Sequence, residues 1–171
     1  DGAVKEGSNL AKNYLLFTQL YNPEFTTANI NTVLRETAND LRALKNEIGK
    51  VDVKLNLTDT IRDRELDPRQ LRMAFFNLGK NAVEALVEHG TETPCIDIES
   101  EQSDGRIIVK LRDNGPGMPE EIAENLFIAF KTKKQGGTGL GLTIAKKIMD
   151  IHHAGIECET GTEGTCFTVT I

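Results

Sequence analysis

The sequence predicts an α+β fold of two layers, a mixed sheet of about five strands covered on one face by three helices and preceded by a short N-terminal helix. Apolar residues recur at three- and four-residue intervals in several segments, which is the period of an amphipathic helix. In other segments they alternate with polar residues, as in half-buried strands. Because most of the expected strands pair as hairpins and the helices are grouped between them, the helices should lie on one face of the sheet.

The first quarter of the chain supplies two helices and a strand. Residues 8–21 have a wide apolar stripe for so short a helix, which Pro23 ends, so we expect this helix to pack against a second chain or a part of the protein outside this sequence. Residues 30–45 repeat the helical period, with Gly49 as a stop signal. Residues 51–57 alternate apolar and polar side chains, which predicts a strand.

The longest helix should begin at Asp67, because an Asp followed by Pro and, three residues on, by Gln is typical of a capped helix start. It should end near residue 88, since Gly90 lies just beyond. Two alternating strands follow around Ile96 and Ile107, joined across a Ser-Asp-Gly turn at 103–105.

The rest of the chain begins with a long segment, 115–137, in which regular structure is unclear. A loop of this length inside a compact domain is usually a lid or a binding loop. A last helix is expected over 140–151, and two strands over 155–159 and 165–171 complete the chain.

The composition indicates a globular intracellular protein. The formal charge of -6 argues against nucleic-acid binding, which needs a basic face. No apolar run approaches the length of a membrane span, so we expect a cytoplasmic protein with any anchor to the inner membrane outside this sequence. The three cysteines, Cys95, Cys158 and Cys166, have no metal-binding spacing and are expected to be free thiols in strands.

Two glycine-rich segments carry the main functional signal. Asp113 to Met118 reads Asp-Asn-Gly-Pro-Gly-Met at the end of an apolar strand, and Gly136 to Leu142 reads Gly-Gly-Thr-Gly-Leu-Gly-Leu at the start of a helix. Asp113 is either a turn residue that caps the loop or a carboxylate that accepts from the amino group of a base. The second segment is either a flexible connector or a phosphate cradle at a helix N-terminus.

Two further groups fit a nucleotide. Asn77 and Asn81 lie one turn apart on one helix face, either as surface residues or as a site where one amide oxygen binds Mg²⁺. Lys131, Lys133 and Lys134 are either solvated or placed to neutralise a terminal phosphate.

Taken in order, these motifs resemble the GHKL ATPase superfamily, and within it the catalytic and ATP-binding domain of two-component sensor histidine kinases. Residues 77–82 resemble the N box, 113–118 the G1 box, 126–130 the F box and 137–142 the G2 box. The resemblance implies a Bergerat-type ATP-binding fold over residues 25–171. Residues 1–24 would then be the end of the helical hairpin that serves dimerisation and phosphotransfer.

The resemblance also implies roles for individual residues. Asn81 would hold Mg²⁺, Asn77 would orient phosphates or water, Asp113 would accept from the adenine amino group, and Lys134 would assist phosphoryl transfer. Residues 119–136 would form a lid over ATP. The nucleotide-contacting residues implied by the motifs are Asn77, Asn81, Asp113, Gly115, Gly117, Met118, Lys134, Thr138, Gly139, Leu140, Gly141 and Leu142.

Two departures from the wider superfamily shape the functional expectation. Its true ATPases place a glutamate one turn before the metal-binding asparagine, and Asn77, which stands there, cannot take a proton. None of His89, His152 and His153 precedes an acidic residue, as the phosphoacceptor histidine of the family usually does. We therefore expect slow hydrolysis and transfer of the γ-phosphoryl group of Mg-ATP to a histidine outside this chain, with a response regulator downstream.

Three other functions remain open on sequence alone. The chain could sense nucleotide without transferring phosphate, or act as a protein serine kinase of the anti-sigma type. A clamp of the mismatch-repair or topoisomerase type is disfavoured by the missing glutamate at position 77 and by the acidic charge.

Overall fold

The computed structural model describes residues 22–44, 51–123, 125–128 and 139–171. The helix expected over 8–21 and the stop expected at Gly49 lie outside the described residues. The described elements, in chain order, are β1 (Thr26–Ala28), α2 (Ile30–Ala43), β2 (Asp52–Leu57), β3 (Arg64–Leu66), α3 (Pro68–His89), β4 (Cys95–Ser103), β5 (Arg106–Asp113), α4 (Glu120–Ala123), α5 (Gly141–Ile151), β6 (Gly155–Gly161) and β7 (Gly164–Thr170).

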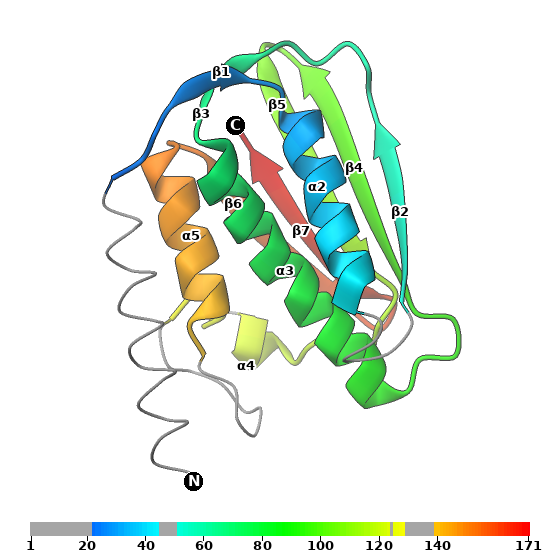
Figure 1. Cartoon of the computed structure of the whole chain (residues 1–171). Coiled ribbons are helices and arrows are strands. Elements are labelled where there is room, and N and C mark those ends of the chain that lie inside the picture. The colour runs from blue at the N-terminus through cyan, green and yellow to red at the C-terminus, as the bar shows by residue number, and fades with distance from the viewer. Residues whose placement is uncertain (1–21, 45–50, 124, 129–138) are drawn as a thin grey trace, which may run out of the picture.

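The main sheet has five strands in the order β2-β4-β5-β7-β6, and α2, α3 and α5 cover one of its faces (Figure 1). β2 pairs with β4 in parallel and the other pairs are antiparallel, so the predicted mixed sheet and two-layer α+β fold are confirmed. The two-stranded sheet of β1 and β3 was not predicted, because three residues per strand are too few to show alternation.

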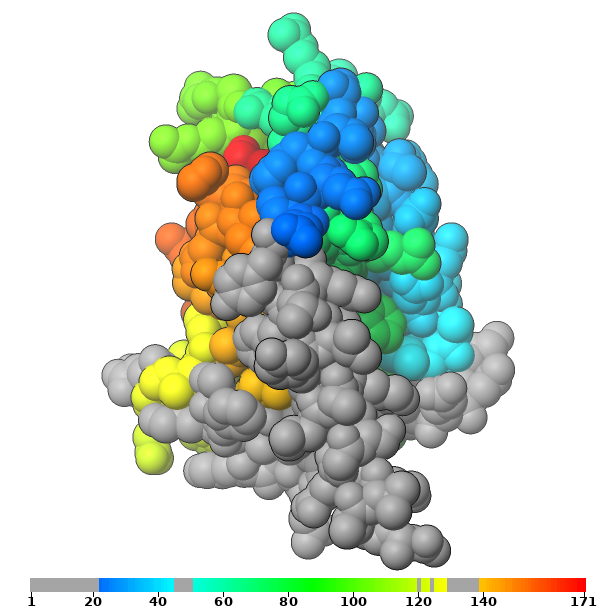
Figure 2. Space-filling model, turned by 60° about the vertical axis from the view of Figure 1, so that its left-hand side comes forward, coloured from blue at the N-terminus to red at the C-terminus, as the bar shows by residue number. Residues whose placement is uncertain are grey.

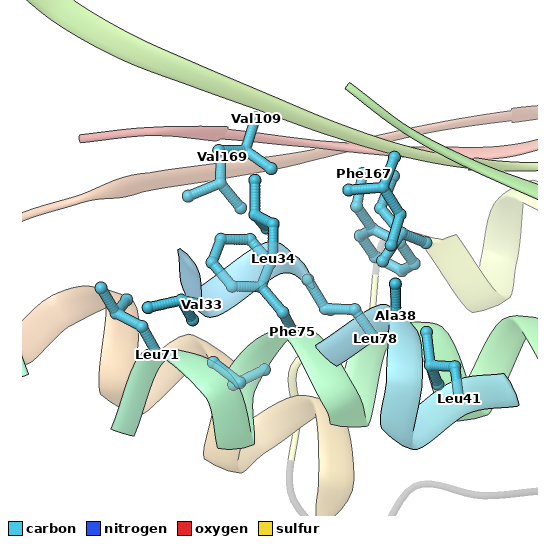
Figure 3. Packing of buried hydrophobic residues seen from close by; sticks show 14 of the residues in the cluster. Val33, Leu34, Ala38, Leu41, Leu71, Phe75, Leu78, Val109, Phe167 and Val169 are labelled. Atoms are coloured by element: carbon cyan, nitrogen blue, oxygen red, sulfur yellow. The ribbon is translucent and has the colours of Figure 1, made fainter. Parts of the chain in front are cut away.

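The core lies between the sheet and the three helices. Figure 3 shows Leu34 of α2 and Phe75 of α3 pointing toward Val109 and Val169 of the sheet. All four of these side chains are at most 2% exposed. Fully burying a side chain of this kind contributes about 1.5–3 kcal/mol. The apolar stripes read from the sequence are therefore the surfaces that hold the two layers together.

The helix ends follow the capping residues in the sequence. The side chain of Asn29 accepts from the N–H of Asn31 at the start of α2. Asp67 caps α3 with Pro68 in the first turn, and Gly90, with a φ of 71°, ends it in the left-handed conformation. Helix α3 is thereby fixed along its length, with the positions of Asn77 and Asn81 in its middle.

Asp67 also ties the segment that precedes β1 to both α3 and α5. Its buried carboxylate accepts from the N–H of Glu24 (2.8 Å), and its own N–H donates to Nε2 of His152 (3.0 Å). Because Nε2 accepts, the ring proton of His152 lies on Nδ1, which donates to the carbonyl of Ile148 (2.8 Å). The ring of Phe25 packs on His152, and Figure 2 shows this segment in blue beside α5 in orange.

The hairpin between β4 and β5 sets the register that places Asp113. Asp104 and Gly105 both have a positive φ, as a two-residue turn of the predicted Ser-Asp-Gly sequence requires. From this turn the ladder runs to its last pair, in which Asp113 lies opposite Ile96. The carboxylate therefore stands at the end of a central strand, at the opposite end of the hairpin from its turn.

Candidate functional site

The glycine-rich segments and the short helix between them lie at one end of the fold. Figure 1 shows α4 and the start of α5 at the lower end of the view, the end toward which β5 runs. β7 begins at the same end, because β5 and β7 are antiparallel and Arg112 pairs with Cys166. The end of β5 with Asp113, the beginning of β7 and the start of α5 therefore lie at the same end of the helix–sheet sandwich.

Asp113 is a buried carboxylate, 5% exposed, that is held by one of its two oxygens. Oδ1 accepts from the N–H of Gly115 (2.9 Å) and from the N–H of Thr165 (3.2 Å). Burial raises the pKa of the Asp113 carboxyl above its ordinary value, while these two N–H groups oppose the rise by stabilising the charged form. Within the described residues no protein group donates to Oδ2, so this oxygen can accept from a ligand.

The turn of the β6–β7 hairpin supports the loop that follows Asp113. A Cβ on Gly164 would overlap the carbonyl oxygen of Asp113, and a Cβ on Gly117 would overlap that of Gly161. Both glycines also have a positive φ. Gly117 and Gly164 thus allow the loop after Asp113 and the hairpin to pack closely against each other.

Two threonines of the same hairpin bond Met118 and Asp113, and the sequence motifs do not predict them. The N–H of Met118 donates to Oγ1 of Thr160 (2.8 Å), and Oγ1 of Thr160 lies 3.4 Å from Oγ1 of Thr165. Thr165 is 5% exposed and also bonds Asp113 through its N–H. The sequence offers only a weak indication of Thr165, a Gly-Thr pair at the start of the last strand. It is weak because strands commonly contain threonine.

Asn114, inside the Asp-Asn-Gly sequence, has a structural role. Its Oδ1 accepts from the N–H of Cys95 (2.8 Å) and its Nδ2 donates to the carbonyl of Thr93 (2.9 Å). Its own N–H donates to the carbonyl of Cys95 (3.3 Å). These bonds fasten the end of β5 to the connection that leads into β4, and so steady the backbone next to Asp113.

Asn77 and Asn81 are half-buried on α3, and Asn77 lies next to the start of α5. An added Cβ at Gly141 would lie 3.2 Å from Oδ1 of Asn77, so the missing side chain lets the first residue of α5 approach the amide. Within the described residues, neither carboxamide has a hydrogen-bond partner in the protein. Half-buried amide groups of this kind are available to a ligand or an ion.

The start of α5 is also available to a ligand. α2 and α3 each begin with a side-chain cap, whereas no side chain caps α5, which begins after the buried Leu140. Gly139, with a φ of 64°, leads into it. The first N–H groups of an uncapped helix and the helix dipole together favour an anion at this position.

The segment between the two glycine motifs is described only in part. Its first residues form α4, and the half-buried Leu126 and Phe127 pack against the core. Oγ1 of Thr143 donates to the carbonyl of Phe127 (3.3 Å), which joins this segment to α5. Lys134 and Thr138, both predicted to contact nucleotide, lie outside the described residues.

The remaining candidate groups do not form a second centre. Among the described residues, no cluster of three His, Cys, Asp or Glu side chains could hold a metal ion. All three cysteines are free and lie in strands, as predicted. Burial raises the pKa of Cys158 to about 11, so this thiol stays protonated at neutral pH. No described helix has the length and apolar character that crossing a bilayer requires.

Comparison with known protein sequences places the chain in a family. Residues 66–171 match the family described as histidine kinase-, DNA gyrase B-, and HSP90-like ATPase. Sporulation kinase E of Bacillus subtilis (strain 168) is 30% identical over 170 residues, covering 98% of this chain and 22% of that protein. The C4-dicarboxylate transport sensor protein DctB of Rhizobium meliloti (strain 1021) is 38% identical over 102 residues, covering 60% of this chain and 16% of that protein. The chain thus spans less than a quarter of either relative.

Solved structures show the same likeness. The catalytic domain of histidine kinase ThkA is 32% identical, with a TM-score of 0.75, and the match covers 86% of this chain and 95% of that one. Full-length ShkA in complex with AMPPNP has a TM-score of 0.79 over 95% of this chain and 35% of that one. At 22% identity the second match shows the fold alone. The architecture is that of histidine kinase catalytic domains.

Gly164→Ala should lower the free energy of unfolding by about 3 kcal/mol or more, because the new methyl group overlaps the Asp113 carbonyl and the φ of 117° is strained for alanine. Gly161→Ala is the matched control, since a Cβ there meets nothing within 4 Å. It should change stability by no more than about 0.5 kcal/mol. Urea denaturation of both variants measures the difference, and equal losses would contradict the packing of the hairpin under Asp113.

Asp113→Asn should stabilise the domain at neutral pH. The amide oxygen can keep both N–H bonds, and the variant lacks the charge that burial disfavours. Because the folded-state pKa is raised, the wild type has its full stability below the unfolded-state pKa of about 3.9 and loses part of it as the pH rises through the folded-state value. Urea denaturation at about pH 4 and about pH 7.5 should therefore show that the free energy of unfolding of Asp113→Asn exceeds that of the wild type by more at the higher pH. A variant that is less stable at the higher pH would refute this reading of Asp113.

Proposed function

The chain belongs to the histidine kinase-, DNA gyrase B-, and HSP90-like ATPase family, and on this premise we propose that it binds Mg-ATP and delivers the γ-phosphoryl group to a histidine outside the chain. The observation that carries the proposal is the joint placement of three groups at one end of the fold. They are a buried carboxylate, an uncapped helix start and two half-buried amides; one carboxylate oxygen and both amides have no protein partner among the described residues.

Asp113 is the proposed base-reading group. Its Oδ1 accepts from two backbone N–H groups, which would leave Oδ2 to accept from a ligand. The exocyclic amino group of adenine is a donor that such an acceptor can select. Gly115, Gly117 and Met118 contribute by holding the loop in place, and Thr165 lies beside the carboxylate.

The start of α5 is the proposed phosphate site. Gly139, Leu140, Gly141 and Leu142 supply the turn and the first N–H groups of an uncapped helix. Thr138 and Lys134, which are assigned from the sequence motifs alone, would complete this phosphate site. Asn77, whose oxygen faces Gly141, would orient the phosphate groups from the side of α3.

The two amides of α3 fit a magnesium ion. Mg²⁺ prefers oxygen ligands and usually keeps several waters and phosphate oxygens, so one amide oxygen free of protein partners is a suitable protein ligand. We assign this role to Asn81, with Asn77 beside it. The bound ion would supply positive charge that offsets the charge of the phosphates.

Transfer to a histidine, in preference to water, is supported by the residue at position 77. An amide cannot take a proton from water, so a general base for hydrolysis is lacking there. The three histidines of the chain are poor acceptors: none of them is followed by an acidic residue, and both ring nitrogens of His152 are hydrogen-bonded. The acceptor is therefore assigned to another domain of a longer protein or of its dimer mate, and a response regulator to the step after it.

Asp113→Asn should weaken ATP binding by about 1–3 kcal/mol, because it places an amide N–H₂ against the amino group of the base. Asp97→Asn is the matched control, since Asp97 lies on β4, paired in the sheet with Arg112. Isothermal titration calorimetry with Mg-ATP measures both. Equal affinities for Asp113→Asn and the wild type would contradict base reading by this carboxylate.

Asn81→Ala should abolish the effect of Mg²⁺ on ATP affinity and should reduce phosphoryl transfer to background. Asn39→Ala on α2, an exposed asparagine that contacts Arg42, is the control and should behave as the wild type. Binding is measured with and without Mg²⁺, and transfer with γ-labelled ATP in a protein that carries the phosphoacceptor domain, by acid-labile label. Normal transfer by Asn81→Ala would refute the metal assignment, and ATP binding by the wild type without any acid-labile label would favour a nucleotide-sensing module.

A further inference from the structure

We propose that Thr160 is a positioning residue that sets which way the Thr165 hydroxyl donates, and that it thereby contributes to the choice of adenine over other purines. This inference rests on the proposed nucleotide site. It concerns a residue of β6, which lies one strand beyond β7 with Thr165 and two strands from β5 with Asp113.

The hydroxyl groups of the two threonines form a short hydrogen-bonded chain with a defined start. The N–H of Met118 can only donate, so Oγ1 of Thr160 must accept from it (2.8 Å). A hydroxyl that accepts a hydrogen bond becomes a better donor. Oγ1 of Thr160 lies 3.4 Å from Oγ1 of Thr165, where either hydroxyl could donate, and we assign the donor role to Thr160 because its oxygen already accepts from Met118.

The direction of this chain decides what Thr165 offers to a ligand. Because its oxygen accepts from Thr160, its own proton is directed elsewhere, and the hydroxyl becomes a donor beside the free oxygen of Asp113. The N–H of Thr165 is already used on Oδ1 of Asp113, which keeps the two groups adjacent. The site therefore presents one acceptor, Asp113, and one donor, the Thr165 hydroxyl.

This pair matches one purine edge. Adenine offers a donor at its amino group and an acceptor at N1, whereas hypoxanthine offers an acceptor at O6 and a donor at N1. Asp113 with a donating Thr165 suits adenine, either directly or through one ordered water. A Thr165 hydroxyl that could rotate freely would serve either edge, so the contribution of N1 to specificity depends on Thr160.

The hairpin fixes the two threonines opposite each other. Thr160 pairs with Thr165 and Gly161 with Gly164, which leaves Thr162 and Glu163 as the turn. Thr165 is 5% exposed, Thr160 is half-buried, and Thr162 is exposed. Cross-strand threonine pairs commonly share hydrogen bonds. This pair adjoins the proposed site because the N–H of Thr165 bonds Asp113.

The test is Thr160→Val, which keeps the shape of the side chain and removes the hydroxyl. Calorimetry with Mg²⁺ compares three ligands: ADP, purine riboside 5′-diphosphate, which keeps N1 as an acceptor but lacks the amino group, and IDP, in which N1 carries a proton. We expect the variant to bind ADP and the purine riboside diphosphate about fivefold more weakly, the ratio that one neutral hydrogen bond contributes. Its affinity for IDP should be unchanged or higher.

Thr160→Ser should restore the wild-type ratios, and Thr162→Val should match the wild type with all three ligands. Thermal unfolding checks each variant, and Thr160→Ala carries the same expectation if Thr160→Val does not fold. An equal loss for all three ligands would mean a structural role only and would overturn the inference, as would an unchanged or tighter affinity for ADP. Failure of the wild type to bind ADP would instead refute the proposed function.

Discussion

The site depends on how one buried carboxylate is held. Charge on Asp113 is disfavoured by burial, and it is tolerated because two backbone N–H groups, from its own loop and from β7, converge on a single oxygen. This arrangement leaves the second oxygen with a fixed direction. The loop glycines, the hairpin turn and Asn114 all act on the backbone around this carboxylate, so they are best understood as its support.

Helix α3 connects this carboxylate to the phosphate end of the site. Its start is fixed by Asp67, its middle carries the two amides, and Leu86 near its end lies beside Gly115. Because α5 packs with its uncapped start against Asn77, the helix layer carries both the amides proposed to bind the metal and the N–H groups proposed to bind phosphate. The sheet layer carries the groups proposed to read the base. A nucleotide bound as proposed would therefore span the two layers.

The sequence was informative wherever a pattern has one physical cause. Asp67, Pro68 and Gly90 predicted the bounds of α3, and alternation predicted the strands of the main sheet. It was less informative where contacts join distant segments. Thr160 and Thr165 are ordinary strand residues until the hairpin is placed under Met118 and Asp113, and the need for glycine at 117 and 164 lies in backbone contacts between different strands.

Asp113 is proposed to read the amino group of the base with its free oxygen. The most direct test is the titration of the Asp113 side-chain carboxyl carbon by NMR, in the free domain and in the domain saturated with Mg-ADP. The free domain should show a pKa above the ordinary value, and bound ADP should lower it, because a donating amino group stabilises the charged form. A pKa that nucleotide binding leaves unchanged or raises would contradict the account.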